Sequence, residues 1–481
     1  MKQKKNHSRR KVVRKNVKKI TATRNLLIPT ILTLLTLIII GTFVLLSQQP
    51  LKNMYGRGIG NILQTTEDII FPPPPDMIYF PITDCQTITQ PGVYTLWQDL
   101  LISESALDQS TRTCITIATS SVTINGNGYS LTFLPTIEEN EYGNSRTAIR
   151  SESPTDQSYS SLTLANITII NFTQSVYLKN LNDSHISNLN ISTKTYKPAY
   201  SIYYNNITDS TLTTSTIALY GNKEATKETA NRNSTTAVYS VFSSGNFTIE
   251  NNSFYLDTGV GRVIELVTPL SGSVIKNNTL RINATSPQHD SALIGIVLSQ
   301  SNHSTIADNF LNITGVGVPP YNIIGMSHYS ANDTLIENNT ITMTGNNMLG
   351  LLTQSPSQRL NVHNNNALIE GVTVEQPPSE DPTSPPVLPT NLLGFTIVSE
   401  NSTITNNSIT ITSKQQDTLF SGNGISIAGS SRSLVANNTI LATIGFIFGI
   451  QSTSNDTTIT HNTVTVGKQS RALWITTQNN T

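Results

Sequence analysis

The segment IENNSF at residues 249–254 is the first clear copy of a motif that decides the fold of this 481-residue chain. In this motif an asparagine pair separates two short apolar runs. It returns, with variations, as IKNNTL (275–280), IADNFL (306–311), IENNTI (336–341), VHNNNA (362–367), ITNNSI (404–409), VANNTI (435–440) and ITHNTV (459–464). The second asparagine of the pair falls at Asn252, Asn278, Asn309, Asn339, Asn365, Asn407, Asn438 and Asn462. These positions lie 24 to 42 residues apart, and a β-rich period of this length is typical of a solenoid.

A second apolar run recurs between successive copies of the motif. It reads RVIELV (262–267), LIGIVL (293–298), NIIGMS (322–327), MLGLLT (348–353), LLGFTIV (392–398), GNGISIA (422–428), GFIFGI (445–450) and SRALWI (470–475). Such short strands, each with one buried face, cannot form a core singly, but strands stacked about 4.8 Å apart bury a continuous interior. We therefore predict an all-β fold, a right-handed parallel β-helix.

An asparagine at a fixed position of each coil has a physical reason. Asparagine tolerates the left-handed backbone conformation that a sharp turn requires. Its side-chain amide can also donate to the same amide one coil away, so that a ladder runs along the solenoid. We interpret the eight asparagines from Asn252 to Asn462 as this scaffold and not as ligand-binding residues.

The N-terminus differs in composition from the rest of the chain. Eleven Lys or Arg and no acid occupy residues 1–24, and the uncharged run LLIPTILTLLTLIIIGTFVLL follows at 26–46. As a helix this run is about 30 Å long, enough to cross a bilayer. Its length and the absence of a small-residue cleavage site favour an uncleaved signal anchor over a cleaved signal peptide. Basic segments can also bind nucleic acid, but beside a membrane segment the positive-inside rule accounts for this one.

These features predict four segments: a basic cytoplasmic tail (1–25), a transmembrane signal-anchor helix (26–47), a proline-rich stalk (48–81) and a β-helix ectodomain (82–481). The protein would be a single-pass type II protein of the cell membrane, with its C-terminal domain outside the cell. The membrane is therefore an expected partner, nucleic acid is not, and the oligomeric state stays open.

Two further features fit an exported body. Cys85 and Cys114 are the only cysteines, and an even count on the outer side favours a disulfide over two free or metal-binding thiols. The body also carries about nineteen Asn-x-Ser/Thr sequons. Candidate glycosylation sites are Asn166, Asn171, Asn246, Asn283, Asn312, Asn401 and Asn455. Because the repeat itself reads N-N-T or N-N-S, other sequon asparagines are explained by structure alone.

Three hydrophilic or proline-rich stretches interrupt the period, at 135–160, 221–236 and 375–390. We expect them to be loops that project from the side of the solenoid, where binding surfaces are common. They are equally consistent with plain polar connections.

The segment between Asp84 and Thr132 resembles the opening coils of right-handed parallel β-helix proteins of the NosD-like and pectate-lyase-like group. It contains DCQTITQPGVYTLWQDLLIS and TCITIATSSVTINGNGYSLT. The matching positions are Cys85, Pro91, Gly92, Tyr94, Leu96, Cys114, Ile115, Val122, Ile124, Gly126, Gly128 and Tyr129. With the downstream asparagine motifs, the resemblance covers roughly residues 82–475. It implies the fold, but this fold carries lyases, hydrolases, adhesins and proteins of other roles.

The residues do not form a recognisable catalytic or metal-binding pattern. The hydrolase signatures of the group (N-T-D, D-D, G-H-G and R-I-K) are missing, and metal handling would require clustered ligands, whereas the histidines occur at varied registers. We therefore name no catalytic, cofactor-binding or metal-binding residue and expect no cofactor. The strongest local cluster comprises Asp257, Arg262, Glu265, Arg281, His289 and Asp290, which we interpret as solvated surface ion pairs.

The sequence thus favours a non-catalytic cell-surface protein for adhesion or contact with glycans. Polar side chains and the aromatic residues Tyr203, Tyr204, Tyr255 and Tyr321 would hydrogen-bond to sugars and stack on them. The alternative is an extracellular polysaccharide lyase or glycoside hydrolase. Whether the protein is an enzyme stays open, with the balance against it, and convergence of three or more charged groups in one groove would revive the enzyme.

Overall fold

A computed structural model of the chain describes residues 79–134, 145–154, 157–194, 200–221, 235–267, 271–284, 293–316, 323–354, 357–372, 390–413, 420–429 and 432–476. The chain divides into two compact units, residues 1–76 and 77–481, and all described residues belong to the second. The predicted tail and membrane segment lie outside the described residues, as does the stalk up to residue 78. Within the described part, no helix has the length and apolar character needed to span a membrane.

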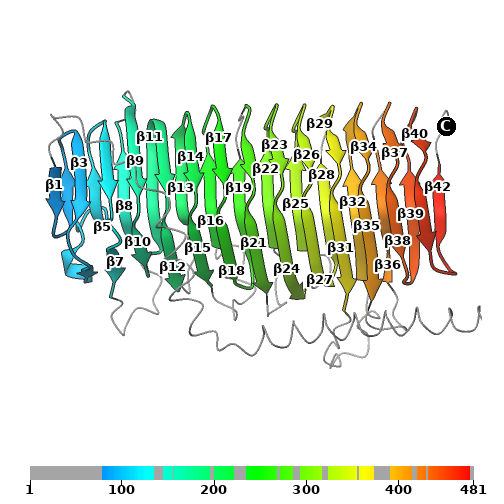
Figure 1. Cartoon of the computed structure of the whole chain (residues 1–481), viewed down its shortest axis with the longest axis horizontal. Coiled ribbons are helices and arrows are strands. Elements are labelled where there is room, and N and C mark those ends of the chain that lie inside the picture. The colour runs from blue at the N-terminus through cyan, green and yellow to red at the C-terminus, as the bar shows by residue number, and fades with distance from the viewer. Residues whose placement is uncertain are drawn as a thin grey trace, which may run out of the picture. The chain divides into compact units, whose positions relative to one another are not determined.

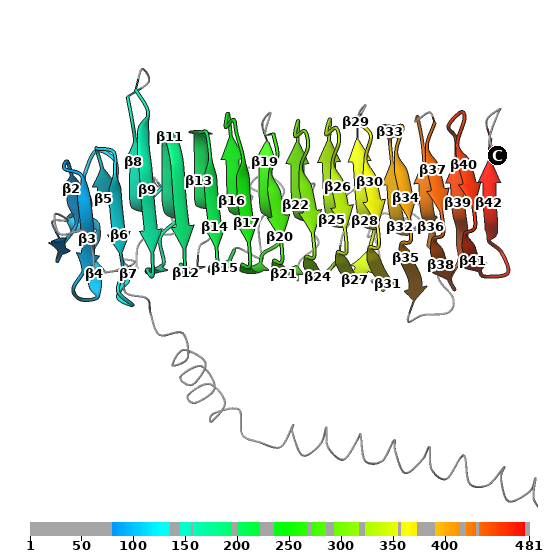
Figure 2. The same ribbon diagram turned by 45° about the horizontal axis from the view of Figure 1, so that its top comes forward.

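The second unit is a parallel β-helix in which each regular coil contributes three strands (Figure 1). One coil consists of β19 (Gly261–Val267), β20 (Val274–Lys276) and β21 (Thr279–Ala284), and each strand pairs in parallel with its counterpart in the next coil. The counterparts form three faces, which we call face 1, face 2 and face 3 in the order of these strands. The coils follow one another along the stack in chain order (Figure 2).

Face 1 contains β2 (Gln86–Ile88), β5 (Thr113–Ile117), β8 (Thr147–Glu152), the first half of β11 (Gln174–Ser187), β13 (Tyr200–Ile207), β16 (Thr235–Val241), β19, β22 (Leu293–Ser299), β25 (Ile323–Tyr329), β28 (Met348–Gln354), β32 (Thr390–Ile397), β36 (Phe420–Ile427), β39 (Phe446–Ser452) and β42 (Arg471–Ile475).

Face 2 contains β1 (Tyr79–Ile82), β3 (Gly92–Leu96), β6 (Val122–Asn125), β9 (Tyr159–Ala165), the second half of β11, β14 (Ser210–Thr213), β17 (Phe247–Glu250), β20, β23 (Thr305–Ala307), β26 (Leu335–Glu337), β30 (Asn361–His363), β34 (Thr403–Thr405), β37 (Leu434–Ala436) and β40 (Thr458–Thr460).

Face 3 contains β4 (Leu100–Ile102), β7 (Ser130–Phe133), β10 (Thr168–Ile170), β12 (Asn190–Lys194), β15 (Thr216–Tyr220), β18 (Ser253–Asp257), β21, β24 (Phe310–Val316), β27 (Thr340–Asn346), β31 (Asn366–Gly371), β35 (Ser408–Ser413), β38 (Thr439–Ala442) and β41 (Thr463–Val466). A short pair, β29 (Ser357–Gln358) and β33 (Ser399–Glu400), lies outside the faces, and a 3₁₀ turn occupies Glu104–Ala106.

The parallel β-helix predicted from the repeat is confirmed, but the asparagine motif is not one strand. It bends at the asparagine pair, so that its first half lies on face 2 and its second half on face 3. The two asparagines have different roles at this corner. The first, such as Asn251 or Asn277, has the left-handed backbone with φ of 59° and 54°. The second turns inward and is buried.

The inward asparagines are joined by hydrogen bonds from Asn252 to Asn462. In each step the side-chain Nδ2 donates to Oδ1 of the asparagine in the next coil at 2.9 to 3.0 Å. Beside this ladder, one continuous apolar core of aliphatic and aromatic side chains runs through the coils. Polar groups at the corners are thereby paired within the protein, as burial requires.

Small residues form a second line, at the middle of the face 1 strands. Gly295, Gly325, Gly350, Gly394 and Gly424 follow one another there, and an added Cβ on each would lie 2.2 to 2.8 Å from the carbonyl oxygen of the next glycine. A contact that short would force the backbone to shift, so the close approach of these successive coils favours glycine.

The longer connections of the chain share one corner. Residues 134–146, 195–199, 221–234, 285–292, 317–322, 372–389 and 414–419 each join the end of a face 3 strand to the start of a face 1 strand. The three predicted loops lie largely outside the described residues. Where residues are described, the prediction for 135–160 is wrong at 147–152 and at 159–160, because β8 and the beginning of β9 lie there. Residues 235–236 and 390 likewise begin β16 and β32.

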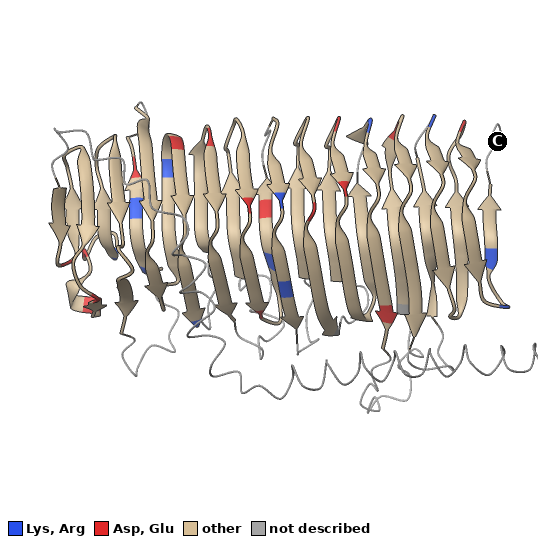
Figure 3. Ribbon diagram, viewed as in Figure 1, with Lys and Arg blue, Asp and Glu red and all other residues tan. Residues whose placement is uncertain are grey.

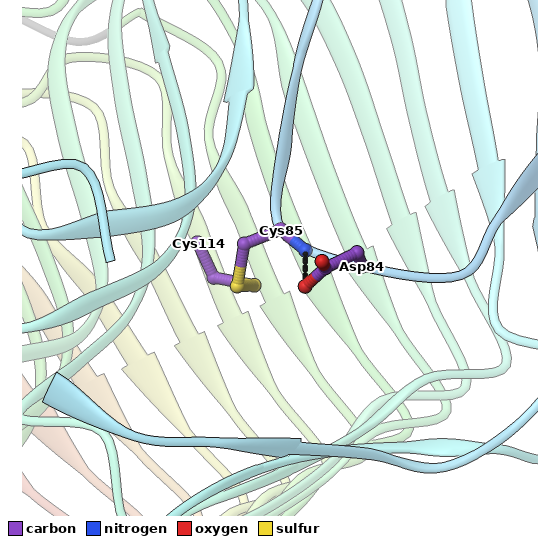
Figure 4. The surroundings of a disulfide bond; sticks show 3 residues. All are labelled: Asp84, Cys85 and Cys114. Atoms are coloured by element: carbon purple, nitrogen blue, oxygen red, sulfur yellow. Dashed lines mark hydrogen bonds between the residues drawn. A yellow bond between two sulfur atoms is a disulfide. The ribbon is translucent and has the colours of Figure 1, made fainter. Parts of the chain in front are cut away.

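The predicted disulfide between Cys85 and Cys114 is confirmed (Figure 4). Cys85 precedes β2 and Cys114 lies in β5, so the bond joins the first two coils of face 1. The backbone N–H of Cys85 also donates to the Asp84 carboxylate at 2.7 Å.

Candidate binding surface

The charged cluster expected from the sequence is divided between two faces. Arg262 and Glu265 lie on β19 of face 1, whereas Asp257 and Arg281 lie on β18 and β21 of face 3. The remaining members, His289 and Asp290, lie outside the described residues. Among the described members, only Arg262 and Glu265 form an ion pair with each other.

A column of tyrosines on the outward side of face 1 is the most distinctive surface of the described residues. Tyr177, Tyr203 and Tyr239 occupy the same register position on three successive coils. Arg150 precedes this column and Glu265 follows it at the same position. We call these five residues the tyrosine column. Its tyrosines are half-buried, so part of each residue reaches the solvent.

The rings of the tyrosine column stack on one another along the solenoid. The Tyr177 and Tyr203 rings are 5.2 Å apart and almost parallel, at 3°, and Tyr203 and Tyr239 are 5.4 Å apart with a tilt of 39°. The Arg150 guanidinium lies 4.4 Å from the centre of the Tyr177 ring. Tyr200, from the neighbouring outward position, contacts Tyr203 edge-on and Tyr239 at a tilt.

This stacking changes how the surface can recognise a sugar. The Tyr203 ring, which the sequence analysis named for stacking on sugars, has the Tyr177 ring on one side and the Tyr239 ring on the other. A sugar ring therefore cannot stack on Tyr203, contrary to the expectation from the sequence. What the column offers is a row of phenol hydroxyls, each able to donate and to accept a hydrogen bond.

The other aromatic residues named from the sequence do not join this surface. Tyr204 was expected to be exposed, but it is 1% exposed and packs edge-on against Phe247 in the core. It follows Tyr203 in the strand, and successive side chains point to opposite faces. Tyr255 is half-buried on the outward side of face 3, next to Tyr220. Tyr321 lies outside the described residues.

Glu265 is the most unusual ionisable group on this surface. Its side chain is paired with Arg262 by a hydrogen-bonded salt bridge, and the residue is 6% exposed. Burial raises the pKa of Glu265 although Arg262 acts in the opposite direction. Burial and the nearby Glu265 also raise the pKa of Tyr239 to about 12.

Charged groups also mark the opposite end of the column. Glu152 accepts hydrogen bonds from Arg150 and from Lys179, the latter at 2.6 Å. Partial burial favours the neutral carboxyl, but the two cations outweigh it and lower the pKa of Glu152. The three groups carry one net positive charge.

Beyond Glu265 the same outward positions become aliphatic. Ile294, Val297, Ile324 and Leu349 form a cluster separate from the interior core, and they are 3 to 9% exposed. On the outer side of face 1, a polar and aromatic stretch is therefore followed by a short apolar patch, and polar residues such as Ser426 and Gln451 return further along the Tyr203-aligned position.

The acids of this surface are too far apart for hydrolysis by a pair of carboxylates. Among described residues, the outward columns of face 1 hold two acids, Glu152 and Glu265. β8 and β19 are four strand spacings apart, roughly 19 Å, whereas glycosidases place their two carboxyls about 5 to 9.5 Å apart. Charged residues are sparse on the other faces too (Figure 3). No group of three or more His, Cys, Asp or Glu in the described part could hold a metal ion.

Comparison with known proteins gives remote structural likenesses and no family. No protein-family model and no curated protein matches the chain. The lidless DFA-IIIase from Arthrobacter chlorophenolicus A6, in complex with GF2, is 12% identical over 83% of this chain and 88% of that chain, with a TM-score of 0.43. The A-module of mannuronan C-5 epimerase AlgE6 from Azotobacter vinelandii is 12% identical over 81% and 89%, with a TM-score of 0.34. At these values the likeness concerns the fold alone.

Tyr177, Tyr200 and Tyr239 were missed by reasoning from the sequence. A signal for the first of them exists, because Tyr177 and Tyr203 are separated by 26 residues, one coil period. The signal is hidden because the upstream coils lack the asparagine pair at the corner between faces 2 and 3, which marks the period downstream. Residues 221–234 also lengthen the sequence separation between Tyr203 and Tyr239.

Proposed function

We propose that the protein binds extended carbohydrate chains along the outward side of face 1. The supporting observation is the tyrosine column, which presents phenol hydroxyls at successive coils, with ring centres 5.2 and 5.4 Å apart. Arg150, Lys179 and Arg262 add charged donors at its two ends. Sugars are bound by such rows of donors and acceptors because each hydroxyl can both donate and accept.

The binding test uses the purified full chain and a panel of polysaccharides, with binding and cleavage scored separately. Tyr203→Phe keeps the stacked ring but removes its hydroxyl. One lost hydrogen bond is worth about 0.5–1.5 kcal/mol, so Kd for the bound polysaccharide should rise about two- to tenfold. Tyr255→Phe, an outward tyrosine of face 3, is the matched control and should leave Kd unchanged. Equal effects of the two variants would contradict the proposal.

A polysaccharide-cleaving enzyme is the second candidate. It is favoured by Glu265, a nearly buried carboxyl with a raised pKa beside an arginine and a tyrosine, because such perturbed groups are frequent in active sites. The spacing of acids on face 1 disfavours hydrolysis. In an elimination, Arg262 would offset the charge of a sugar carboxylate and Glu265 or Tyr239 would take the proton from the carbon next to it. The glycosidic C–O bond at the adjoining carbon would then break as a C=C bond forms, and the leaving sugar oxygen would take up a proton. This candidate would be established over simple binding if the protein cleaves a polysaccharide and Glu265→Gln abolishes the cleavage while binding is retained.

We also propose that this surface stands outside the cell on a type II membrane anchor, and that the chain belongs to the NosD-like and pectate-lyase-like group. The supporting features for the anchor are the basic residues 1–24 and the apolar run 26–46. Protease added to intact cells should then degrade the β-helix and leave a membrane fragment containing residues 1–47. Full protection of the β-helix would refute this topology.

A further inference from the structure

The corner between face 2 and face 3 separates two kinds of asparagine that the sequence does not distinguish. The first asparagine of each pair has a left-handed backbone and an exposed side chain. The second is buried and belongs to the ladder. The ladder therefore does not use the first asparagine, and the exposed side chain of Asn277 makes only a long hydrogen bond, at 3.5 Å, to the Glu250 carboxylate.

The glycosylation sequon falls on the exposed member of the pair. In Asn-Asn-Thr or Asn-Asn-Ser the acceptor is the first asparagine, and the required hydroxyl is on the third residue. This pattern occurs at Asn251, Asn277, Asn338, Asn406 and Asn437, all exposed and with φ of 54 to 59°. The hydroxyl residue begins the face 3 strand and is not buried at any of the five sites. Acceptor and hydroxyl thus both face solvent in every case.

We infer that these five asparagines form a row of N-linked glycan attachment sites along one edge of the solenoid. In the transfer, the Asn side-chain nitrogen forms a bond to C1 of the first sugar of a lipid-pyrophosphate-linked oligosaccharide. The bond from C1 to the phosphate oxygen breaks, the lipid pyrophosphate leaves with its electron pair, and a base of the transferase takes the amide proton. The inference presupposes the proposed exposure of the β-helix outside the cell and is independent of what face 1 binds.

Sequon acceptors are placed so that the tyrosine column stays bare. Acceptors also occur at the corner between faces 1 and 2, such as Asn246 and Asn401, and on face 3, such as Asn312. Two outward positions recur on the strands of face 1, one aligned with Tyr203 and the other with Tyr200. Among described residues, no sequon acceptor occupies either position. An exposed acceptor, Asn206, also lies at the end of β13, three residues after Tyr203. Attached glycans would thus cover the edges and leave the register positions of the tyrosine column themselves unmodified.

The chain contains its own matched control. Asn364 occupies the same corner, with φ of 55° and an exposed side chain, but Asn366 stands where the hydroxyl should be. The full chain is produced in a eukaryotic secretory host, and its N-glycans are removed enzymatically in ¹⁸O water. This converts each glycosylated asparagine to an ¹⁸O-labelled aspartate, which mass spectrometry of the peptides locates. We expect the ¹⁸O label at corner acceptors such as Asn277 and none at Asn364. Thr279→Val should remove the label from Asn277 without unfolding the coil.

The opposite results are equally clear. Labelling at Asn246, Asn312 or Asn401 with none at the five corner sites would overturn the inference, because the transferase would have reached the chain and passed over the corner. Absence of label at every sequon would overturn it as well. Since the polysaccharide-binding test can be run on deglycosylated protein, failure of either proposal is distinguishable from failure of the other.

Discussion

Asn278 gives both of its nearest donors to one atom of Asn309. Its side-chain Nδ2 donates to Asn309 Oδ1 at 3.0 Å and its backbone N–H donates to the same oxygen at 3.1 Å. The Nδ2 group also donates to the backbone carbonyl of Ile249, in the preceding coil, at 2.7 Å. Each inward asparagine therefore ties three successive coils, which explains why the motif survives variation at its other positions.

Asn309→Ala should destabilise the solenoid strongly. The change leaves the Asn278 N–H and the carbonyl of Ile275 without their partners inside the core. A buried group left unpaired costs about 1–3 kcal/mol, so these two groups together should lower the free energy of unfolding by about 2–6 kcal/mol. Urea denaturation followed by circular dichroism measures it. Asn462→Ala, at the partly buried end of the ladder, should cost less, and equal costs would contradict the ladder's role.

Gly394→Ala tests the close approach of coils on face 1. The new Cβ would lie 2.2 Å from the carbonyl oxygen of Gly424, so the backbone must shift. Overpacking of this kind costs about 1–3 kcal/mol or more. Gly467→Ala is the control, because its Cβ would meet no atom closer than 3.7 Å. The thermal midpoint should fall clearly for the first variant and stay close to wild type for the second.

Reduction of the Cys85–Cys114 disulfide should loosen the first coils. The bond closes a loop with a sequence separation of 29 residues, and in the chain-entropy model such a loop contributes about 3–4 kcal/mol. Cys85→Ala with Cys114→Ala should therefore raise amide hydrogen exchange in β2 and β5. Exchange in β36 and β39 should not change, since repeats of a solenoid contact only their neighbours. Uniform loosening along the chain would argue against this local effect.

Much of the architecture followed from the sequence because the coil repeats its residues at fixed positions. The pairing of Asn252 with Asn278 needs only the period, and Cys85 with Cys114 needs only their count and location. A sharp turn at the asparagine pair was expected, but the sequence assigned the turn and the ladder to the same asparagine. The structure divides these roles between Asn277, which has the left-handed backbone, and Asn278, which is buried in the ladder. The tyrosine column was missed for a different reason. Whether Tyr203 or Tyr204 points outward depends on the strand's register, and a shift of one residue reverses it.

The surface acid Glu265 predicts a pH effect of its own. Burial raises its pKa, so the folded state disfavours the ionised carboxylate. Its contribution to stability is greatest below its unfolded pKa and is lost as pH rises through the folded pKa. Glu265→Gln should flatten this part of the stability profile in urea melts between pH 4 and 8. A profile identical to that of the wild type would show that Glu265 is not destabilised by burial.

His328 predicts a pH effect of the opposite sign. The side chain lies in the core between Leu298 and Thr353 of the adjoining coils, is 0% exposed, and neither ring nitrogen has a hydrogen-bond partner. Burial lowers its pKa to about 4 from 6.5. Below pH 6.5 His328 becomes protonated in the unfolded chain but stays neutral in the folded chain. The free energy of unfolding is therefore highest above pH 6.5 and decreases by about 3 kcal/mol as the pH falls to 4.

His328→Leu fills the same core position without a titratable group, so it isolates this effect. The variant should be more stable than the wild type at pH 5, and the difference between the two should shrink as pH rises to 7. His303→Leu, at an exposed corner, is the control and should keep the wild-type loss of stability between pH 6.5 and 4. Should His328→Leu lose as much stability as the wild type over that range, another group must take up the proton. Denaturant melts at half-unit pH steps distinguish these results. The stability difference between His328→Leu and the wild type is expected to change with pH between pH 6.5 and 4, and to be constant above pH 6.5.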